Sequence, residues 1–271
     1  MIHEIKEATE YLKNHGVTAP EVGIILGTGL GNRFVEKIKN PIIINYNFIP
    51  FFPVSTVEFH KGKLIYGEVK GKKVLAMQGR FHYYEGYSMQ QITLPVRVMK
   101  MLGVKQLLIS NAAGNMNMKW KKGDLMLIDD HINLQPDNPL RGENFEVLGP
   151  RFPDMSQPYS KKLNDKLIRI AKDKKIKLHK GVYVAVMGPN LETRAEYRFL
   201  HQFGADAVGM STVPEVLVAN HMGLPCCAIS VLTDDCDPDN LKPAVISEII
   251  AVAGKAEAKL TELYVELISK L

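Results

Sequence analysis

The stretch Gly79–Tyr87 holds the residues best suited to chemistry, an arginine, a histidine and three tyrosines beside two glycines. A hydrophobic core has no use for this mixture. Arg80 and His82, separated by one residue, fit a clamp for an oxyanion such as phosphate, because both side chains donate hydrogen bonds. The tyrosines offer flat faces and hydroxyls to a less charged group. Taken alone, the stretch also fits an exposed polar loop, so the surrounding elements must decide.

Short apolar strands alternate with helical segments along the chain, and most of the strands end in small and polar residues. The pattern predicts strands at about 22–26, 107–109, 125–128, 182–186, 206–208 and 226–232, a hairpin at 63–69 and 73–78, and helices at about 3–15, 88–102, 159–174, 192–203, 214–222 and 242–268. This alternation indicates one α/β domain over residues 1–271, with a sheet covered on both faces. Ligands of such sheets bind at the carboxyl ends of strands, where we expect the site.

Composition narrows the classes of function. The chain has 271 residues, of which 46% are hydrophobic and 23% charged, and its net charge of +5 comes from dispersed lysines. This balance demands no nucleic-acid partner and suits a small anionic substrate. No apolar run is long enough to span a membrane, and the first residues do not form a signal peptide. Three cysteines form neither a disulfide framework nor a CxxC site, so we expect a cytoplasmic protein.

The glycine-rich turn Gly27–Gly31 follows a strand but does not match a dinucleotide or nucleotide fingerprint. It reads GxGxG rather than GxGxxG, positions 38–53 hold no acidic residue, and no Gly-Lys-Ser/Thr follows. The turn exposes backbone N–H groups and the Thr28 hydroxyl, which suits an anion but also fits a tight βα turn.

The sequence argues against a metal site, and it leaves two interpretations each for Glu192 and for the segment 135–158. The acidic run 234–239 lacks the glycine and glutamate of a calcium loop, and His60 and His131 have no partner at metal-ligand spacing, so we expect no metal. Glu192 is expected in the first turn of the helix 192–203, either as a helix-start residue or as a ligand-binding one. The proline-rich segment 135–158 predicts a long loop that is functional or lies at an interface.

Seven motifs, in order along nearly the whole chain, resemble those of the trimeric purine nucleoside phosphorylases and the related methylthioadenosine phosphorylases. They are GTGLG at 27–31, GRFHYYEG at 79–86, NAAG at 111–114, NPLRG at 138–142, RFPDMS at 151–156, GPNLET at 188–193 and GMSTVPE at 209–215. No single motif is decisive, but their joint occurrence is specific. The resemblance implies an α/β fold, a three-layer α/β/α sandwich around a mixed, partly barrel-like β-sheet, assembled as a homotrimer.

The resemblance also implies the reaction and its residues. Phosphate would cleave inosine and guanosine, with adenosine and 2′-deoxy forms as an extension, to free purine and ribose 1-phosphate in purine salvage. Inorganic phosphate is then a co-substrate, and no cofactor is expected. The residues carried over for phosphate are Thr28, His60, Arg80, His82, the Ala112 backbone N–H and Ser211. Those carried over for the nucleoside are Tyr84, Ala112, Met210, Glu192 and Asp234, with catalysis assigned to His82, Glu192 and Asp234.

The chemistry of these residues suits such a reaction. Phosphate dianion is already a nucleophile, so the protein has to position it rather than activate it. An ionised Glu192 would accept a hydrogen bond from a purine that carries N1–H, which selects 6-oxopurines.

Three positions depart from the pattern that the chain resembles. Asp234 stands where the 6-oxopurine enzymes have asparagine and is shared with the methylthioadenosine branch. When ionised it would repel a purine that gains negative charge; when protonated it could donate to N7, and it could also accept from a 6-amino group. We therefore hypothesise that activity extends towards adenosine. Ser247 replaces a histidine near the 5′-hydroxyl, and Leu148, in a loosely aligned loop, stands where animal enzymes present an aromatic to the neighbouring subunit.

Other functions compete with this interpretation. A methylthioadenosine phosphorylase is the main alternative, although that branch is expected to carry a small polar residue in place of Glu192. A non-catalytic binder of nucleoside or phosphate on the same fold is a second alternative. A nicotinamide-dependent oxidoreductase is disfavoured by the broken glycine fingerprint.

Overall fold

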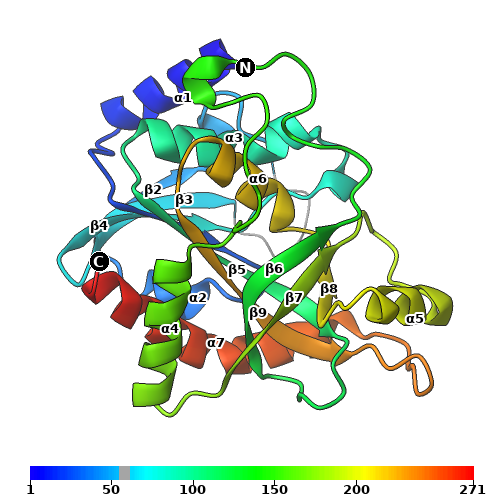
Figure 1. Ribbon diagram of the computed structural model, residues 1–271. Coiled ribbons are helices and arrows are strands. Elements are labelled where there is room, and N and C mark those ends of the chain that lie inside the picture. Colours follow the sequence, from blue (N-terminus) through cyan, green and yellow to red (C-terminus); the bar gives the residue numbers. More distant parts are fainter. Residues whose placement is uncertain (55–61) are drawn as a thin grey trace.

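The computed structural model describes residues 1–54 and 62–271, and a mixed β-sheet runs through its centre (Figure 1). The strands are β1 (Val22–Leu26), β2 (Lys39–Asn45), β3 (Lys63–Val69), β4 (Lys72–Gln78), β5 (Gln106–Asn115), β6 (Leu125–Asn133), β7 (Leu178–Ala185), β8 (Ala207–Gly209) and β9 (Cys226–Asp235). The helices are α1 (Ile2–Asn14), α2 (Asn32–Val35), α3 (Met89–Met101), α4 (Lys161–Asp173), α5 (Arg194–Gln202), α6 (Val213–His221) and α7 (Ile246–Ser269).

The sheet is open at one side and closed at the other. Over the described residues its strand order is β2-β3-β4-β1-β5-β8-β7-β6-β9, and β9 pairs a second time with β5. That second pairing is parallel and joins Leu107 opposite Cys226 through to Asn115 opposite Asp235. The strands β5, β8, β7, β6 and β9 therefore form a closed five-stranded barrel, and β1 to β4 extend from it. The expected mixed, partly barrel-like sheet is confirmed.

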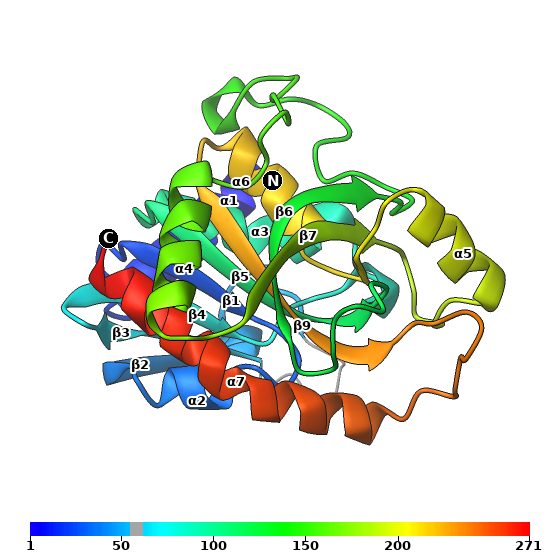
Figure 2. The same cartoon turned by 60° about the horizontal axis from the view of Figure 1, so that its bottom comes forward.

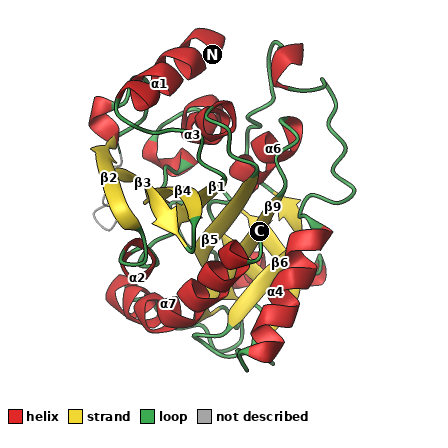
Figure 3. Ribbon diagram, turned by 90° about the vertical axis from the view of Figure 1, so that its left-hand side faces the viewer, coloured by secondary structure: helices red, strands yellow, loops and turns green. Residues whose placement is uncertain are grey.

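Helices cover both faces of this sheet, as Figures 2 and 3 show. On one face α1, α3 and α6 pack together and bury apolar side chains against β4, β5 and β9. On the other face α2, α4 and the long α7 cover a second apolar cluster. The interior strands are buried on both faces, which explains why β1 reads as an uninterrupted apolar run. The expected α/β/α layers are confirmed.

Local signals place several helix starts where the sequence predicts them. Ser88 and Gln91 form the expected reciprocal capping box at the start of α3. Thr193 and Glu196 form a second such box at the start of α5. Ser160 caps α4 through the backbone amide of Leu163. No helix of the described part of the chain is both long and apolar enough to cross a membrane.

Several boundaries differ from the prediction, and β2 and α2 were not predicted. Two of the differences concern residues nominated for the site. The strand predicted at about 107–109 is longer than predicted: β5 continues through the NAAG motif at 111–114, since β9 pairs with the motif along its length and β8 pairs with its end. Glu192 lies outside α5, because Thr193 is the N-cap and the helix begins at Arg194. The prediction that Glu192 occupies the first helical turn is therefore wrong.

Candidate active site

One cleft collects the residues singled out from the sequence. It lies where β1, β4, β5, β8 and β9 end. Its lining includes Thr28, Arg80, His82, Tyr84, Ala112, Glu192, Met210, Ser211 and Asp234. His60 falls within 55–61, outside the described residues. Nine of the ten residues that the sequence nominated thus meet in one place.

The guanidinium of Arg80 marks one end of the cleft. The side chain is 2% exposed, its Nε lies 3.2 Å from Glu215 Oε1, and its Nη1 donates to Ser211 Oγ at 2.8 Å. Glu215 is also buried, on α6, so the ion pair is shielded from water. A buried carboxylate fixes the direction of the guanidinium, which makes Arg80 a rigid anchor for an anion.

His82 lies next to this anchor and remains neutral. Its Nδ1 lies 3.1 Å from Glu85 Oε1, the same oxygen that accepts from the His82 backbone amide at 2.8 Å. Burial lowers the pKa of the imidazole, and the nearby Arg80 cation also lowers it, while Glu85 acts in the opposite direction. The ring stacks on Tyr84 with centroids 4.7 Å apart. The rest of this stretch holds the loop in place, as Phe81 packs against Tyr46 and Tyr87.

The turn after β1 needs glycine because its backbone passes very close to β5. A Cβ on Gly27 would lie 2.8 Å from both the Asn111 Cα and the Ser110 carbonyl oxygen. Gly29 adopts a φ of +72°, which favours glycine. The turn thus brings Thr28 into the cleft beside Ala112.

Thr212 has an unusual backbone conformation and contacts both Asn111 and Arg80. It has a φ of +70°, which is a strained value for a β-branched residue, and it is fully buried as the N-cap of α6. Its hydroxyl accepts from Asn111 Nδ2 at 2.8 Å and lies 3.4 Å from Arg80 Nη1. These contacts compensate for the strain and place Ser211 against the guanidinium.

Two carboxylates lie at the other end of the cleft. Burial raises the pKa of Glu192, and the charge of Asp234 raises it further, whereas hydrogen bonds from its own backbone amide and from Tyr197 oppose the shift. Asp234 Oδ1 accepts from the Thr233 hydroxyl at 2.7 Å, and Oδ2 accepts from the Cys236 thiol at 3.7 Å. The cleft therefore has a cationic end and an acidic end.

Met210 forms part of the wall between these ends. A Cβ on Gly188 would lie 2.2 Å from the Met210 sulfur, so the glycine of the GPNLET motif makes room for this side chain. Met210 also lines the cleft beside Val208 and Gly209. A polarizable apolar side chain at this position suits the flat, uncharged part of a ligand.

Two of the three positions that depart from the family pattern, Leu148 and Ser247, do not line the cleft. Leu148 is 5% exposed and packs into the core of its own chain, so it does not present a side chain to a neighbouring subunit. The exposed apolar residues of that loop are Val147 and Phe152, at 81% and 88%. Ser247 is exposed in the first turn of α7, and Ile249 of the same helix reaches the cleft instead.

Sequence reasoning missed several residues of the site. Tyr197 and Cys236 line its acidic end, and neither was nominated. Glu215 belongs to the GMSTVPE motif, but no local signal says that it pairs with Arg80. Among the described residues, no group of three or more histidines, cysteines and carboxylates could hold a metal ion.

The sequence is similar to those of known phosphorylases. The model of the phosphorylase superfamily matches residues 21–269. A purine nucleoside phosphorylase of Bacillus subtilis is 48% identical over 270 residues, covering 100% of this chain and 99% of the relative.

Solved structures agree over the whole chain. Isoform 2 of the Schistosoma mansoni purine nucleoside phosphorylase, in complex with cytosine and ribose-1-phosphate, has a TM-score of 0.94 and 42% identity, covering 99% of this chain and 96% of its own. A Schistosoma mansoni enzyme in complex with adenosine has a TM-score of 0.93 and 40% identity, with 100% and 98% covered. A complex with inosine has a TM-score of 0.93 and 39% identity, with 100% and 97% covered.

Proposed function

Since the chain belongs to the phosphorylase superfamily, and within it to the purine nucleoside phosphorylases, we propose that the cleft is where it cleaves purine nucleosides with phosphate. The enzyme is a pentosyltransferase that yields a free purine and ribose 1-phosphate, a reaction of purine salvage. The observation that carries the site assignment is the cleft itself, which joins a buried guanidinium to two carboxylates.

The cationic end suits the phosphate. Arg80, the Ser211 hydroxyl and the backbone N–H groups around Thr28 and Ala112 would hold the dianion. The N–H of neutral His82 is directed at Glu85, so its Nε2 would accept from the phosphate hydroxyl. His60 is proposed for the same ion from the resemblance alone. Tyr84 and Met210 line the wall between the two ends, where the ribose would lie.

The reaction itself requires positioning and charge stabilisation. A phosphate oxygen attacks C1′ while the C1′–N9 bond breaks, and the electron pair of that bond leaves with the purine. The sugar passes through a cationic state next to the bound dianion, which stabilises it. The purine gains negative charge, so a donor at its edge lowers the barrier. The base would lie at the acidic end, against Glu192 and Asp234.

Base preference depends on these two carboxylates. Glu192 in its ionised form accepts from N1–H of a 6-oxopurine, as in inosine and guanosine. Asp234 is contacted by two donors, the Thr233 hydroxyl and the Cys236 thiol, so both of its oxygens act as hydrogen-bond acceptors. Such a group suits a 6-amino group, and we propose that adenosine is a second substrate.

Replacement of Asp234 tests the extension to adenosine. In Asp234→Asn we expect kcat/KM for adenosine to fall relative to inosine by about tenfold or more, because a charge-assisted hydrogen bond to the amino group is lost. The measurement is the ratio of the two kcat/KM values in wild type and variant. An unchanged ratio would contradict the role of Asp234.

The protonation state of Glu192 should make the preference between adenosine and inosine depend on pH. Below its pKa, the carboxyl is protonated and can donate to N1 of adenine, whereas above it the carboxylate accepts from N1–H of a 6-oxopurine. Burial raises this pKa, and the charges of Asp234 and Glu196 raise it further, whereas the hydrogen bond from Tyr197 lowers it. We therefore expect the adenosine-to-inosine ratio of kcat/KM to increase from neutral to mildly acidic pH. A ratio that stays constant over that range would contradict the assignment.

Initial rates with and without phosphate test the proposed function. Inosine, guanosine, adenosine, 2′-deoxyinosine and methylthioadenosine should each be compared. We expect base release that requires phosphate and is fastest for a 6-oxopurine nucleoside. A preference for methylthioadenosine would support the alternative phosphorylase, which Glu192 disfavours. Base release without phosphate would indicate a hydrolase.

We also propose a cytoplasmic homotrimer. The loop 135–158 exposes Val147 and Phe152, which suits a subunit interface. Cys226, Cys227 and Cys236 are free and buried, as expected in a reducing compartment. Light scattering tests the assembly, since a trimer has three times the 30.3 kDa chain mass.

A further inference from the structure

Two side chains without a role in the reaction above, Tyr197 and Cys236, lie at the acidic end of the cleft with Glu192 and Asp234. They are 3% and 2% exposed and belong to one small apolar cluster. Polar atoms buried at a ligand site require partners. The partners of these two are the carboxyl groups that the base would contact.

The Cys236 thiol is held against Asp234 by the strand ladder. The Cys236 backbone amide donates to the Asn115 carbonyl at 2.8 Å, which continues the pairing of β5 with β9 by one residue. Side chains two residues apart in an extended chain share a face, so the thiol lies beside Asp234, and its Sγ is 3.7 Å from Oδ2. A Cβ on Gly114 would lie 2.4 Å from that sulfur, so the glycine of the NAAG motif makes room for the thiol.

Tyr197 connects the thiol to Glu192. It lies in the first turns of α5, five residues after Glu192, it shares an apolar cluster with Cys236 and lines the cleft with Glu192, and a hydrogen bond from its hydroxyl lowers the pKa of Glu192. Burial raises the pKa of both the Tyr197 hydroxyl and the Cys236 thiol, so each remains a protonated donor.

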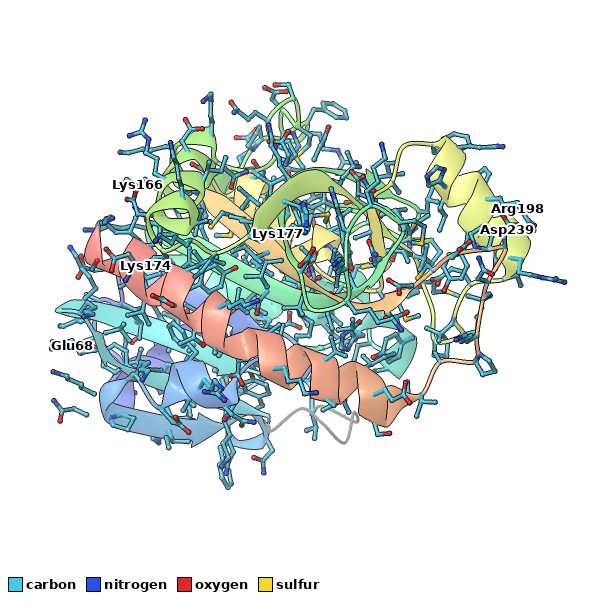
Figure 4. The ribbon with its side chains drawn as sticks, turned by 90° about the horizontal axis from the view of Figure 1, so that it is seen from below. Glu68, Lys166, Lys174, Lys177, Arg198 and Asp239 are labelled. Carbon is cyan, nitrogen blue, oxygen red and sulfur yellow. The ribbon has the colours of Figure 1, made fainter. Side chains whose placement is uncertain are left out.

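An ion pair ties the two supporting elements together. Arg198 of α5 donates to Asp239, which follows β9, at 2.7 Å, and the two side chains point toward one another in Figure 4. The helix that carries Tyr197 is therefore linked to the segment that follows Cys236. Because both side chains are exposed, the pair contributes little to stability, but it shows that α5 lies beside the segment that follows β9.

The two carboxylates repel each other, and the cations among the described cleft residues lie at the other end. The groups that act on Glu192 are its own backbone amide, Tyr197, Asp234 and Glu196. Two of these are like charges, and Tyr197 supplies the side-chain donor. Neutral donors between like charges reduce the cost of keeping both ionised.

We propose that Tyr197 and Cys236 are positioning residues that form a neutral bridge between Glu192 and Asp234, in which the Tyr197 hydroxyl donates to Glu192 and the Cys236 thiol donates to Asp234, so that both carboxylates are held as oriented acceptors for the purine. The inference rests on the proposed function. It assigns the specificity of the base site to four residues rather than to the two carboxylates alone.

Removal of single donor atoms tests the bridge. In Tyr197→Phe we expect kcat/KM for inosine to fall about 3- to 10-fold, because one hydrogen bond to an ionised group is lost. The acid limb of its pH profile should move to higher pH by about 0.5 to 1 unit, since Glu192 becomes easier to protonate. Cys236→Ala should lower kcat/KM for adenosine by a similar factor through Asp234, whereas Cys236→Ser keeps a donor and should restore most of it.

A matched control removes a hydroxyl elsewhere. Tyr66 on β3 donates to the Thr18 carbonyl at 2.6 Å and does not line the cleft, so the pH profile of Tyr66→Phe should superimpose on that of wild type. Tyr197→Phe and Tyr66→Phe each remove one oxygen and keep the ring, and thermal unfolding checks that both are folded. Absence of phosphate-dependent cleavage in wild type would overturn the proposed function itself. An unshifted pH profile for Tyr197→Phe together with an unchanged kcat/KM for adenosine in Cys236→Ala, in an active background, would overturn this inference alone.

Discussion

Arg80→Ala is expected to lower kcat/KM for inosine phosphorolysis by about a thousandfold, the largest loss of any single change in the cleft. The guanidinium is the buried cation of the site and donates to Ser211, so its removal leaves the phosphate without its principal anchor. Steady-state rates at increasing phosphate concentration measure the effect. A non-catalytic binder would lose affinity but would show no turnover in wild type.

The same change is expected to destabilise the fold, which the experiment must separate from the loss of activity. Removing Arg80 leaves Glu215 buried without its partner, at a cost of about 3–5 kcal/mol. The double variant Arg80→Met with Glu215→Gln removes both charges and should recover much of the stability but none of the activity. Recovery of phosphorolysis in the double variant would contradict the assignment of Arg80 to phosphate.

Arg97→Met provides a matched control. Arg97 is 2% exposed and contacts His221 at 3.4 Å, but it does not line the cleft. Burial lowers the pKa of its guanidinium to about 10. Loss of this second buried arginine should change the unfolding temperature and leave kcat/KM close to that of wild type.

Glu192→Gln is expected to lower kcat/KM for inosine by about 100- to 1000-fold, because the base site then loses a charged acceptor for N1–H. The amide of the glutamine can donate to N1 of adenine, so the value for adenosine should fall much less and the preference should move towards adenosine. Competition between the two nucleosides in one reaction measures the preference directly.

Glu196→Gln is the control for this variant. Glu196 belongs to the same helix start, is exposed, and accepts from the Thr193 backbone amide, which a glutamine can also do. Its rates should therefore match those of wild type. Equal losses for inosine and adenosine in Glu192→Gln would indicate a general disturbance of the cleft rather than recognition of the purine edge.

Local patterns in the sequence account for much of the fold and for the nomination of the site. The strand at Val22–Leu26, the hairpin of β3 and β4, and the capping box at Ser88 follow from apolar periodicity and side-chain chemistry that act over a few residues. Arg80 and His82 could be nominated because a polar clamp beside glycines has no role in a core. Their convergence with Thr28 and Ser211 followed from the rule that ligands bind where strands end.

The tertiary structure decided what depends on pairing between distant segments. Closure of the barrel requires β9 to pair with β5, and that pairing extends the strand predicted at about 107–109 through the NAAG stretch. Glu192 precedes α5 instead of starting it, Leu148 turns inward, and Glu215 reaches Arg80 from α6. Tyr197 and Cys236 meet between the carboxylates only because α5 folds back beside the end of β9. Propensity and motif act along the chain, whereas these contacts arise from packing across it, which no local signal encodes.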